Sequence, residues 1–579
     1  MSNIASYLML VAMILALATS FSLGYSNIES RYQGPFIFSS SVFLALGVML
    51  LVFITSAYIY ADKIYMIALV LVFTGFLSKY LMPYYLFNGY VNYDTPIHYL
   101  SALYLEDTGL HPGYHYHAWP SSLFLVNLYS SISGIAFPID YSIIALVSRF
   151  LIPLSLYLIS KRYLASKKAI LIALSVLLVF EPFIIHPCPQ ITAVALTSLA
   201  LIVFVVWLHE KELKMSYPLL ILGMSIATYH AIIFIAMTLS IIFILVFYKL
   251  AMKLRLSNMH KPIHTKHLSI YFIVIIFIIE IMFYNVFITS SVTKSLVRAI
   301  ILIVQGSQVR LDVYSLIIVN PQLKWQYDLL SSLNRLATIL LLGVPSITVA
   351  LRLLIKFLKT KLTMQEEAIL TISLIAGFNA FLFIIFGIFV NIGLVERIYQ
   401  LSIILAPLLT AYFFNEYLTK NTHYNKSKIM KKVALSALLA NLFIFTLLSI
   451  FISPAYTSLY VYAFGETEMN AAQWTAIHLP SYKINLDGSG QLNQLIALYS
   501  YPNHIYAVNL SVSRMMEKNA LIGTYSYPVG MIITTRKPLT IGATVVKGLS
   551  DAVTNSYINK LPVYTNKIFS NYICEIFVS

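Results

Sequence analysis

Charged residues are scarce in this chain. They make up 10% of its 579 residues, whereas 59% are hydrophobic; ordinary soluble domains have about 25% charged and 45–50% apolar residues. This excludes an ordinary soluble domain and predicts a polytopic membrane protein. The formal net charge is +16, but Lys and Arg cluster in short segments between apolar runs, as they do in cytoplasmic loops. We therefore expect no nucleic-acid partner.

Cysteine and phosphate-binding glycine motifs are also sparse or missing. The two cysteines, Cys188 and Cys574, are too few for a disulfide framework and have no metal-ligand spacing. The chain has no Gly-rich loop that would hold a nucleotide pyrophosphate, which favours a lipid-linked substrate. We also find no internal repeat, although secondary transporters tend to have one.

Long apolar runs, by contrast, occupy most of the sequence. A bilayer core about 30 Å thick needs roughly 20 apolar residues of helix. The runs that we predict as transmembrane helices are Ile4–Leu23, Phe36–Tyr60, Ile64–Tyr84, Tyr141–Ser160, Ala169–Ile185, Ile191–Leu208, Tyr217–Tyr229, Ala231–Tyr248, Leu268–Phe287, Leu336–Leu354, Ala368–Val390, Ile398–Phe414 and Val433–Ile452. The expected fold class is an all-α polytopic membrane bundle of about 13 transmembrane helices, with a small C-terminal extracytoplasmic α/β domain.

The positive residues predict the orientation of the bundle, because Lys and Arg in short loops stay cytoplasmic. Five clusters fall on one side in this assignment: Lys161, Arg162, Lys167 and Lys168; Lys211 and Lys214; Lys249, Lys253, Arg255, Lys261 and Lys266; Lys356, Lys359 and Lys361; and Lys420, Lys426, Lys428, Lys431 and Lys432. The N-terminus is then cytoplasmic in a multi-pass protein of the cell membrane. The Asn92–Pro120 loop and the C-terminal tail lie outside.

Two segments decide the number of membrane crossings, and with it which loops share a side. Tyr217–Tyr248 is either one long tilted helix or a hairpin that turns at His230, and the basic residues at both of its ends favour the hairpin. Ser121–Pro138 is apolar enough to span the membrane but rich in serine. We interpret it as a helix that lies in the outer interface.

The hydrophobic runs stop at Ser453. Glu466–His478 has helical spacing, and the β-branched runs Met531–Thr535 and Leu539–Val546 predict strands. We predict an external α/β domain of about 110–125 residues. The expected domain organisation is residues 1–84 as N-terminal transmembrane helices, 85–140 as the first long external loop, 141–452 as the transmembrane core and 453–579 as the extracytoplasmic domain.

Polar residues that can support chemistry concentrate in the Asn92–Pro120 loop, NYDTPIHYLSALYLEDTGLHPGYHYHAWP. Asp94 stands at a predicted helix start, because Pro96 suits a first helical turn. His98 follows one turn later on the same face. Asp94 either caps this helix or acts as a general base on an acceptor hydroxyl or amide.

The same loop invites a metal-site interpretation. The spacing of His115 and His117 suits an extended segment with both rings on one face, but it matches no fixed zinc signature. These histidines either bind a metal or hydrogen-bond headgroups or substrate. Alternatively, Asp94 binds Mg or Mn through oxygen ligands, with Glu106 or Asp107 helping. The cofactor stays open: none, a divalent cation such as Mg or Mn, or Zn.

Ionisable residues inside apolar spans are functional candidates because their burial is costly. Arg149 lies within a predicted span, and Arg397, with Glu396 beside it, lies at the outer mouth of another. Each guanidinium is suited to a lipid phosphate. The structural alternative for Arg397 is snorkelling to headgroups or pairing with Glu396. His230 also maps to the outer half. We count His98, His230 and Glu396 with the two arginines as candidates that bind the donor phosphate or the substrate.

Together these features resemble the GT-C superfamily of membrane glycosyltransferases, which includes oligosaccharyltransferase catalytic subunits, protein O-mannosyltransferases and aminoarabinose transferases. The resemblance rests on the acidic residue in YVNYDTPIHYL, the HPGYHYHAWPSSLFLVNLYSSISGI segment and Arg149 soon afterwards. The ATYHA turn, the ERIYQLSIILAPLLTAY helix and ETEMNAAQWTAIHLP are similar to prokaryotic members of this group.

The resemblance implies a sugar donor on a polyprenyl or dolichyl phosphate and a glycan or protein acceptor at the extracytoplasmic face. It implies Asp94 as base or metal ligand, and Arg149 and Arg397 as residues that hold the donor phosphate. The first loop has no DxD, and the external domain has no WWDYG-like element. These departures count against an oligosaccharyltransferase and leave open a relative without catalysis.

Two other classes of function compete with a transferase. A secondary transporter or permease fits the polytopic composition, although the ionisable residues gather toward one side rather than at the midplane. A noncatalytic envelope protein would use its external domain to bind partners.

Overall fold

The computed structural model describes part of the chain. Described are scattered residues between 65 and 80, residues 95–109, 120–134, 139–180 except 165, 189–210, 213–253, 268–282, 317–318, 339–360, 362–389 and 392–419, and short segments between 472 and 578. The predicted spans Ile4–Leu23, Phe36–Tyr60 and Val433–Ile452 lie outside these residues.

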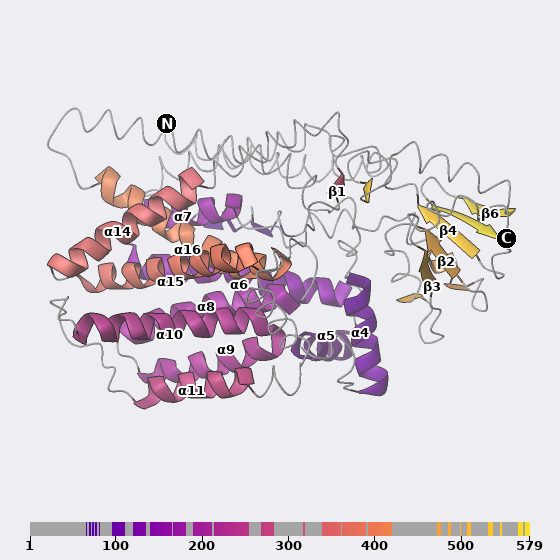
Figure 1. Cartoon of the computed structure of the whole chain (residues 1–579), viewed down its shortest axis with the longest axis horizontal. Coiled ribbons are helices and arrows are strands. Elements are labelled where there is room, and N and C mark those ends of the chain that lie inside the picture. The colour runs from indigo at the N-terminus through magenta and orange to yellow at the C-terminus, as the bar shows by residue number, and fades with distance from the viewer. Residues whose placement is uncertain are drawn as a thin grey trace.

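Long apolar helices form a bundle in which they run side by side (Figure 1). They are α6 (Ile139–Tyr163), α7 (Lys167–Phe180), α8 (Pro189–Glu210), α9 (Ser216–Tyr229), α10 (Ala231–Lys253), α11 (Leu268–Met282), α14 (Val344–Lys359), α15 (Met364–Phe389) and α16 (Ile392–Thr419). The short turns η3 (Leu213–Met215) and η6 (Ile339–Gly343) precede α9 and α14. Parts of α6, α8, α10 and α15 are long and apolar enough to cross a bilayer, and the chain is a helical membrane protein.

Each of these bundle helices overlaps one predicted span, and the bounds of α16 differ from the prediction at a charged segment. The span was predicted from Ile398, whereas the helix begins at Ile392 and ends at Thr419. A hydropathy window finds the apolar section, but Glu396 and Arg397 continue the backbone hydrogen bonding of the helix. Both therefore lie in the second turn of α16 rather than before it.

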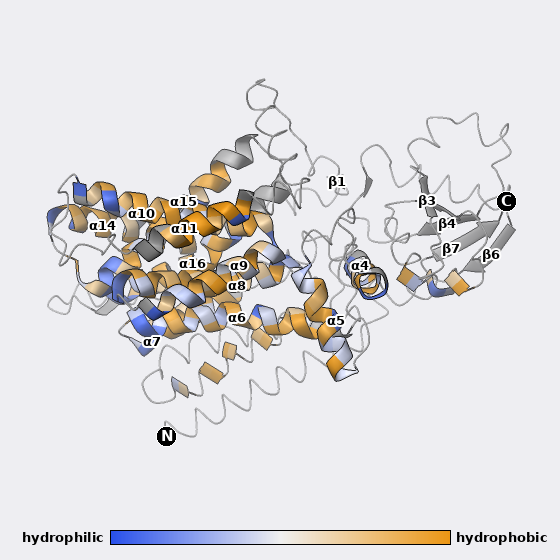
Figure 2. Ribbon diagram, turned by 90° about the horizontal axis from the view of Figure 1, so that it is seen from below, coloured by the Kyte–Doolittle hydropathy of each residue, from blue (hydrophilic) through white to orange (hydrophobic). Residues whose placement is uncertain are grey.

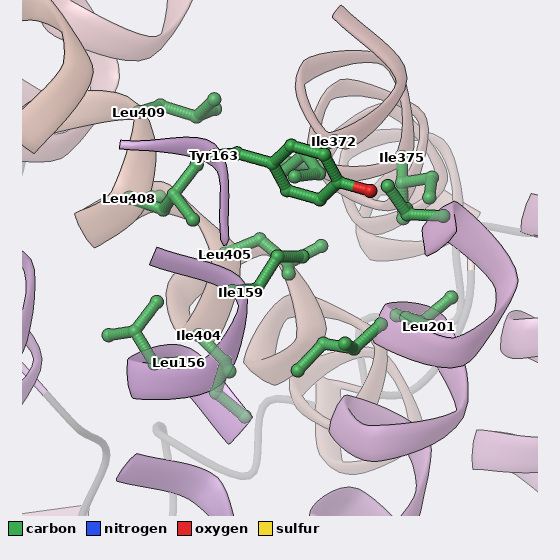
Figure 3. Close-up of a cluster of buried hydrophobic side chains, with 14 of the residues drawn as sticks. Leu156, Ile159, Tyr163, Leu201, Ile372, Ile375, Ile404, Leu405, Leu408 and Leu409 are labelled. Carbon is green, nitrogen blue, oxygen red and sulfur yellow. The ribbon is translucent and has the colours of Figure 1, made fainter. Parts of the chain in front are cut away.

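Figure 3 shows part of the bundle interior, a cluster of buried hydrophobic side chains with labelled residues from α6, α8, α15 and α16. Its labelled members are Leu156, Ile159 and Tyr163 of α6, Leu201 of α8, Ile372 and Ile375 of α15, and Ile404, Leu405, Leu408 and Leu409 of α16. Lipid tails are as apolar as these side chains, so close packing and interhelical hydrogen bonds hold membrane helices together. One such bond joins α15 to α10, where Asn379 Nδ2 donates to Ser240 Oγ at 2.9 Å.

The bundle helices are apolar along most of their length, as the hydropathy colouring in Figure 2 shows, and many of these apolar side chains are exposed. Exposed large side chains include Val246 and Leu250 of α10, Phe272 and Ile279 of α11, and Ile347 and Leu351 of α14. Exposed apolar side chains on several long apolar helices indicate contact with lipid.

Basic residues gather at one end of the bundle. Arg162 at the end of α6 pairs with Glu210 at the end of α8, and Lys356 near the end of α14 lies 2.6 Å from a carboxylate oxygen of Glu366 at the start of α15. Hydrophilic residues gather at the same end of the helices in Figure 2. We call this the basic end, and the basic clusters near residues 161 and 356 share it as predicted.

The hairpin predicted at His230 is confirmed. α9 begins just after α8 ends, at the basic end, and α10 returns there, because Tyr248 of α10 and His209 of α8 both hydrogen-bond Thr371 Oγ1, at 2.9 and 2.7 Å. His230 alone separates the two helices, and its backbone is extended.

α5 (Ser121–Ser133) was predicted to lie in the interface as Ser121–Pro138. Gly134 ends the helix with φ of 67°, a left-handed conformation that glycine adopts at no steric cost. Its 13 residues cover about 20 Å, which is too short to cross the hydrocarbon core. The interpretation as a helix that does not span therefore agrees with its length.

A five-stranded sheet occupies the C-terminal region, in the order β3-β2-β4-β7-β6. The strands are β2 (Ile484–Asp487), β3 (Ala507–Leu510), β4 (Met531–Thr535), β6 (Asn566–Ser570) and β7 (Cys574–Val578), and a separate pair joins β1 (Ile317–Ile318) to β5 (Val545–Val546). β3, β2 and β4 are parallel, whereas β7 is antiparallel to β4 and β6. β4 matches the predicted strand Met531–Thr535. The sheet lies beyond α4 (Thr95–Thr108), away from the basic end (Figure 1).

α9 packs tightly against α11 at Gly223. A Cβ at this position would overlap the ring of Phe277, which is fully buried and packs edge-on against Phe234 at a centroid distance of 5.3 Å. We expect Gly223→Ala to destabilise the protein by about 1–3 kcal/mol, since the ring has to move. Thermal unfolding of the purified protein in detergent measures this.

Gly377 of α15 provides a matched control. A Cβ there meets no other atom within 4 Å, so Gly377→Ala is expected to stabilise the helix by about 0.5–1 kcal/mol. Equal unfolding temperatures for the two variants would contradict the close packing of α9 on α11.

Candidate functional site

The helix predicted after Asp94 is α4, which begins at Thr95 and ends at Thr108. Its start agrees with Pro96 as a first-turn residue. Asp94 lies just outside the described residues, and its position in the chain is directly before the first residue of α4. His98 follows in the first turn, one helical turn after Asp94.

α4 is held against α5 by one buried face. His98 is only 2% exposed, and Tyr99 and Ser101 are fully buried. Ala102 and Leu105 of α4 pack with Leu123 of α5 in a small hydrophobic cluster. Both views place α4 and α5 at the end of the bundle opposite the basic end (Figures 1 and 2).

Hydrogen bonds continue from α4 through α5 to the turn at His230. Asn127 Nδ2 of α5 donates to the carbonyl of Ala102 at 2.9 Å, and Ser121 Oγ donates to Thr228 Oγ1 of α9 at 2.6 Å. His230, two residues after Thr228, is buried. The helix that carries His98 and the turn that carries His230 are therefore joined through α5.

Arg149 of α6 is buried, with 4% of its surface exposed. Its guanidinium carbon lies 4.2 Å from the ring centroid of Tyr80, and that ring packs edge-on against Phe150 at 5.5 Å. A cation over an aromatic face is stabilised by the ring quadrupole, more so when desolvated. Burying a charge inside a membrane bundle is nevertheless costly and marks a functional candidate.

Arg149 lies at the level of the first turn of α8. Thr192 Oγ1 donates to Ser148 Oγ at 3.0 Å, and Ser148 is the residue before Arg149. Two residues earlier in α8, Gln190 Nε2 donates to Gln400 Oε1 of α16 at 3.0 Å. The start of α8 thus contacts both helices that carry a predicted arginine.

Glu396 and Arg397 belong to the helical backbone of α16, and their side chains lie outside the part of the chain that the structure describes. Arg397 precedes Gln400 by three residues, so the two positions share a face of the helix. The loop histidines His115 and His117 also fall outside the described residues.

Glu106 and Asp107 cannot assist Asp94 as the sequence suggested. Both are exposed near the end of α4, about 17 Å along the helix axis from its first residue. Ligands of one cation lie within about 2–2.6 Å of it, so the rigid helix keeps these carboxylates apart. Among the described residues, no group of three His, Cys, Asp or Glu side chains is arranged to hold a metal.

Tyr80, Gln190 and Gln400 are the site residues that the sequence reasoning missed. Tyr80 was one of many aromatic residues in an apolar run, with no sign that it covers Arg149. Gln400 could have been found from the sequence, because a buried amide in an apolar helix needs a hydrogen-bond partner. It also lies one turn after Arg397.

The arrangement has two chemical capacities. A buried arginine and a second arginine-bearing segment near one helix start can neutralise an anion at the end of the bundle. The first turn of α4 carries His98, one helical turn after Asp94 in the chain. Histidine and aspartate are residue types that transfer protons.

No protein-family model and no curated protein matches the chain in sequence. Among solved structures, the chain is similar to ArnT from Cupriavidus metallidurans, which was crystallised with bound undecaprenyl phosphate. The two share 9% sequence identity with a TM-score of 0.46, over 89% of this chain and 98% of that one. A similarity of this size assigns no activity.

Proposed function

We propose that this chain is a membrane glycosyltransferase that moves a sugar from a polyprenyl-phosphate or dolichyl-phosphate donor to a glycan or protein acceptor at the extracytoplasmic face. The observation that supports this most is the burial of His98, Arg149 and His230. Their segments are hydrogen-bonded to the start of α8 or through α5 to the end of α9, which lie opposite the basic end. Since basic segments stay cytoplasmic, the far end faces outward.

The proposed reaction divides the work between two kinds of group. Asp94 accepts the proton of the acceptor hydroxyl or amide, which then forms a bond to the anomeric carbon of the sugar. The bond from that carbon to the phosphate oxygen breaks, and the electron pair leaves with the lipid phosphate. Arg149 and Arg397 neutralise the negative charge on this leaving group. A divalent cation at Asp94 would supply the same neutralisation.

The proposal is tested with the purified full-length protein in proteoliposomes that contain polyprenyl-phosphate-linked sugars. The expected result is release of polyprenyl phosphate that depends on added acceptor. Parallel reactions with and without chelator decide whether a divalent cation takes part. Uptake of solute without any glycan product would instead identify a transporter, and absence of both would favour a noncatalytic envelope protein.

A further inference from the structure

The first turn of α8 makes two hydrogen bonds to two different helices. Gln190 Nε2 donates to Gln400 Oε1 of α16 at 3.0 Å, and Thr192 Oγ1 donates to Ser148 Oγ of α6, also at 3.0 Å. Gln400, Thr192 and Ser148 are each at most 8% exposed. These polar groups exchange hydrogen bonds where water has little access, which makes their partners specific.

The two bonds leave α8 in opposite directions. Successive residues of an α-helix are rotated by about 100°, so positions 190 and 192 lie about 200° apart around the helix axis. α8 contacts both α6 and α16. Its first turn therefore lies between α6 and α16 and holds each of them by a side-chain hydrogen bond.

Each bond acts next to a residue proposed to hold the donor phosphate. Ser148 immediately precedes the buried Arg149 on α6. Gln400 lies one turn after Arg397 on α16, at a position on the same helix face. The start of α8 consequently connects the two arginine-bearing helices by side-chain hydrogen bonds.

We propose that Gln190 and Gln400 form a positioning pair that fixes the start of α16, with Glu396 and Arg397, at its distance from Arg149. This inference rests on the proposed function. Groups that neutralise a leaving phosphate act only when they are correctly placed, and a misplacement of about 1 Å can lower the rate by about 100-fold. Gln190 and Gln400 are not proposed to touch the substrate.

Methionine substitutions separate positioning from simple stability, because Met has nearly the length and volume of Gln without its amide. Gln190→Met and Gln400→Met each leave one amide in the interior without its partner, so both are expected to unfold at a lower temperature. The double variant removes both amides and is expected to recover most of the unfolding temperature.

Activity should behave differently from stability. Each single variant is expected to lose about 10- to 100-fold in kcat/KM, with a raised KM for the polyprenyl-phosphate sugar. The double variant should stay equally impaired, since the hydrogen bond that sets the spacing is still absent. Ser240→Ala, which breaks the bond from Asn379 between α10 and α15, should lower the unfolding temperature and leave this KM unchanged.

Recovery of kcat/KM in the double variant, in step with its unfolding temperature, would show that the pair only stabilises the bundle and would overturn the inference. Unchanged kinetics in both single variants would overturn it as well. A wild-type protein that neither transfers sugar nor binds polyprenyl monophosphate in nanodiscs would instead remove the proposed function itself, and the positioning role with it.

Discussion

Asp94→Asn is expected to lower sugar transfer by about 100- to 10,000-fold, the contribution of a positioned general base. Asparagine caps a helix as well as aspartate does, so α4 should keep its start at Thr95. The substitution therefore separates the two roles that the sequence left open. Initial rates with a polyprenyl-phosphate sugar donor, together with the unfolding temperature, measure both.

Two further variants complete this experiment. Asp94→Ala removes the cap as well as the base, and should add a loss of about 0.5–2 kcal/mol in stability to the loss of activity. Glu106→Gln is the matched control, because it neutralises an exposed carboxylate near the other end of α4 and should leave the rate unchanged. Full activity in Asp94→Asn would reduce Asp94 to a helix cap.

Arg149→Met is expected to lower kcat/KM by about 100- to 1,000-fold, the effect of losing one donor that stabilises charge in a transition state. Arg149→Lys should rescue little of this, since a lysine lacks the planar fork that grips a phosphate with two hydrogen bonds. Steady-state kinetics with increasing donor concentration distinguish weaker binding from slower chemistry.

Tyr80 tests whether the orientation of Arg149 matters. Its ring lies 4.2 Å from the guanidinium carbon, and a desolvated cation–π contact is worth about 2 kcal/mol. Tyr80→Leu should therefore lower kcat/KM by about 10- to 30-fold, less than the loss of Arg149 itself. Wild-type kinetics in Arg149→Met would remove this arginine from the site, whatever the effect of Tyr80→Leu.

Hydropathy was sufficient to predict the bundle helices that the structure describes. In lipid, an apolar run such as Ile191–Leu208 can satisfy its backbone hydrogen bonds only by forming a helix or a closed barrel. The structure has the helix α8 (Pro189–Glu210) at this run. The turn at His230 was also predictable, because basic residues at both ends of Tyr217–Tyr248 require the chain to return. Bounds differed where charged residues continue a helix, as at the start of α16.

Interhelical partners were not predictable from the sequence. Gln190 and Gln400 are 210 residues apart, and no periodicity pairs them. Tyr80 and Arg149 come from different helices in the same way. The opposite error arose for Glu106, which was expected to help Asp94 because both lie in one polar segment. α4 holds Glu106 near its far end and prevents the chain from folding back.

The single-residue joint between α9 and α10 constrains how the chain enters the bilayer. α9 has 14 residues and reaches about 21 Å, too little to anchor a nascent chain across a core of about 30 Å. α10, with 23 residues, is long enough, at about 34 Å. We therefore expect the two helices to enter lipid together, as a hairpin in which α10 compensates for the short reach of α9.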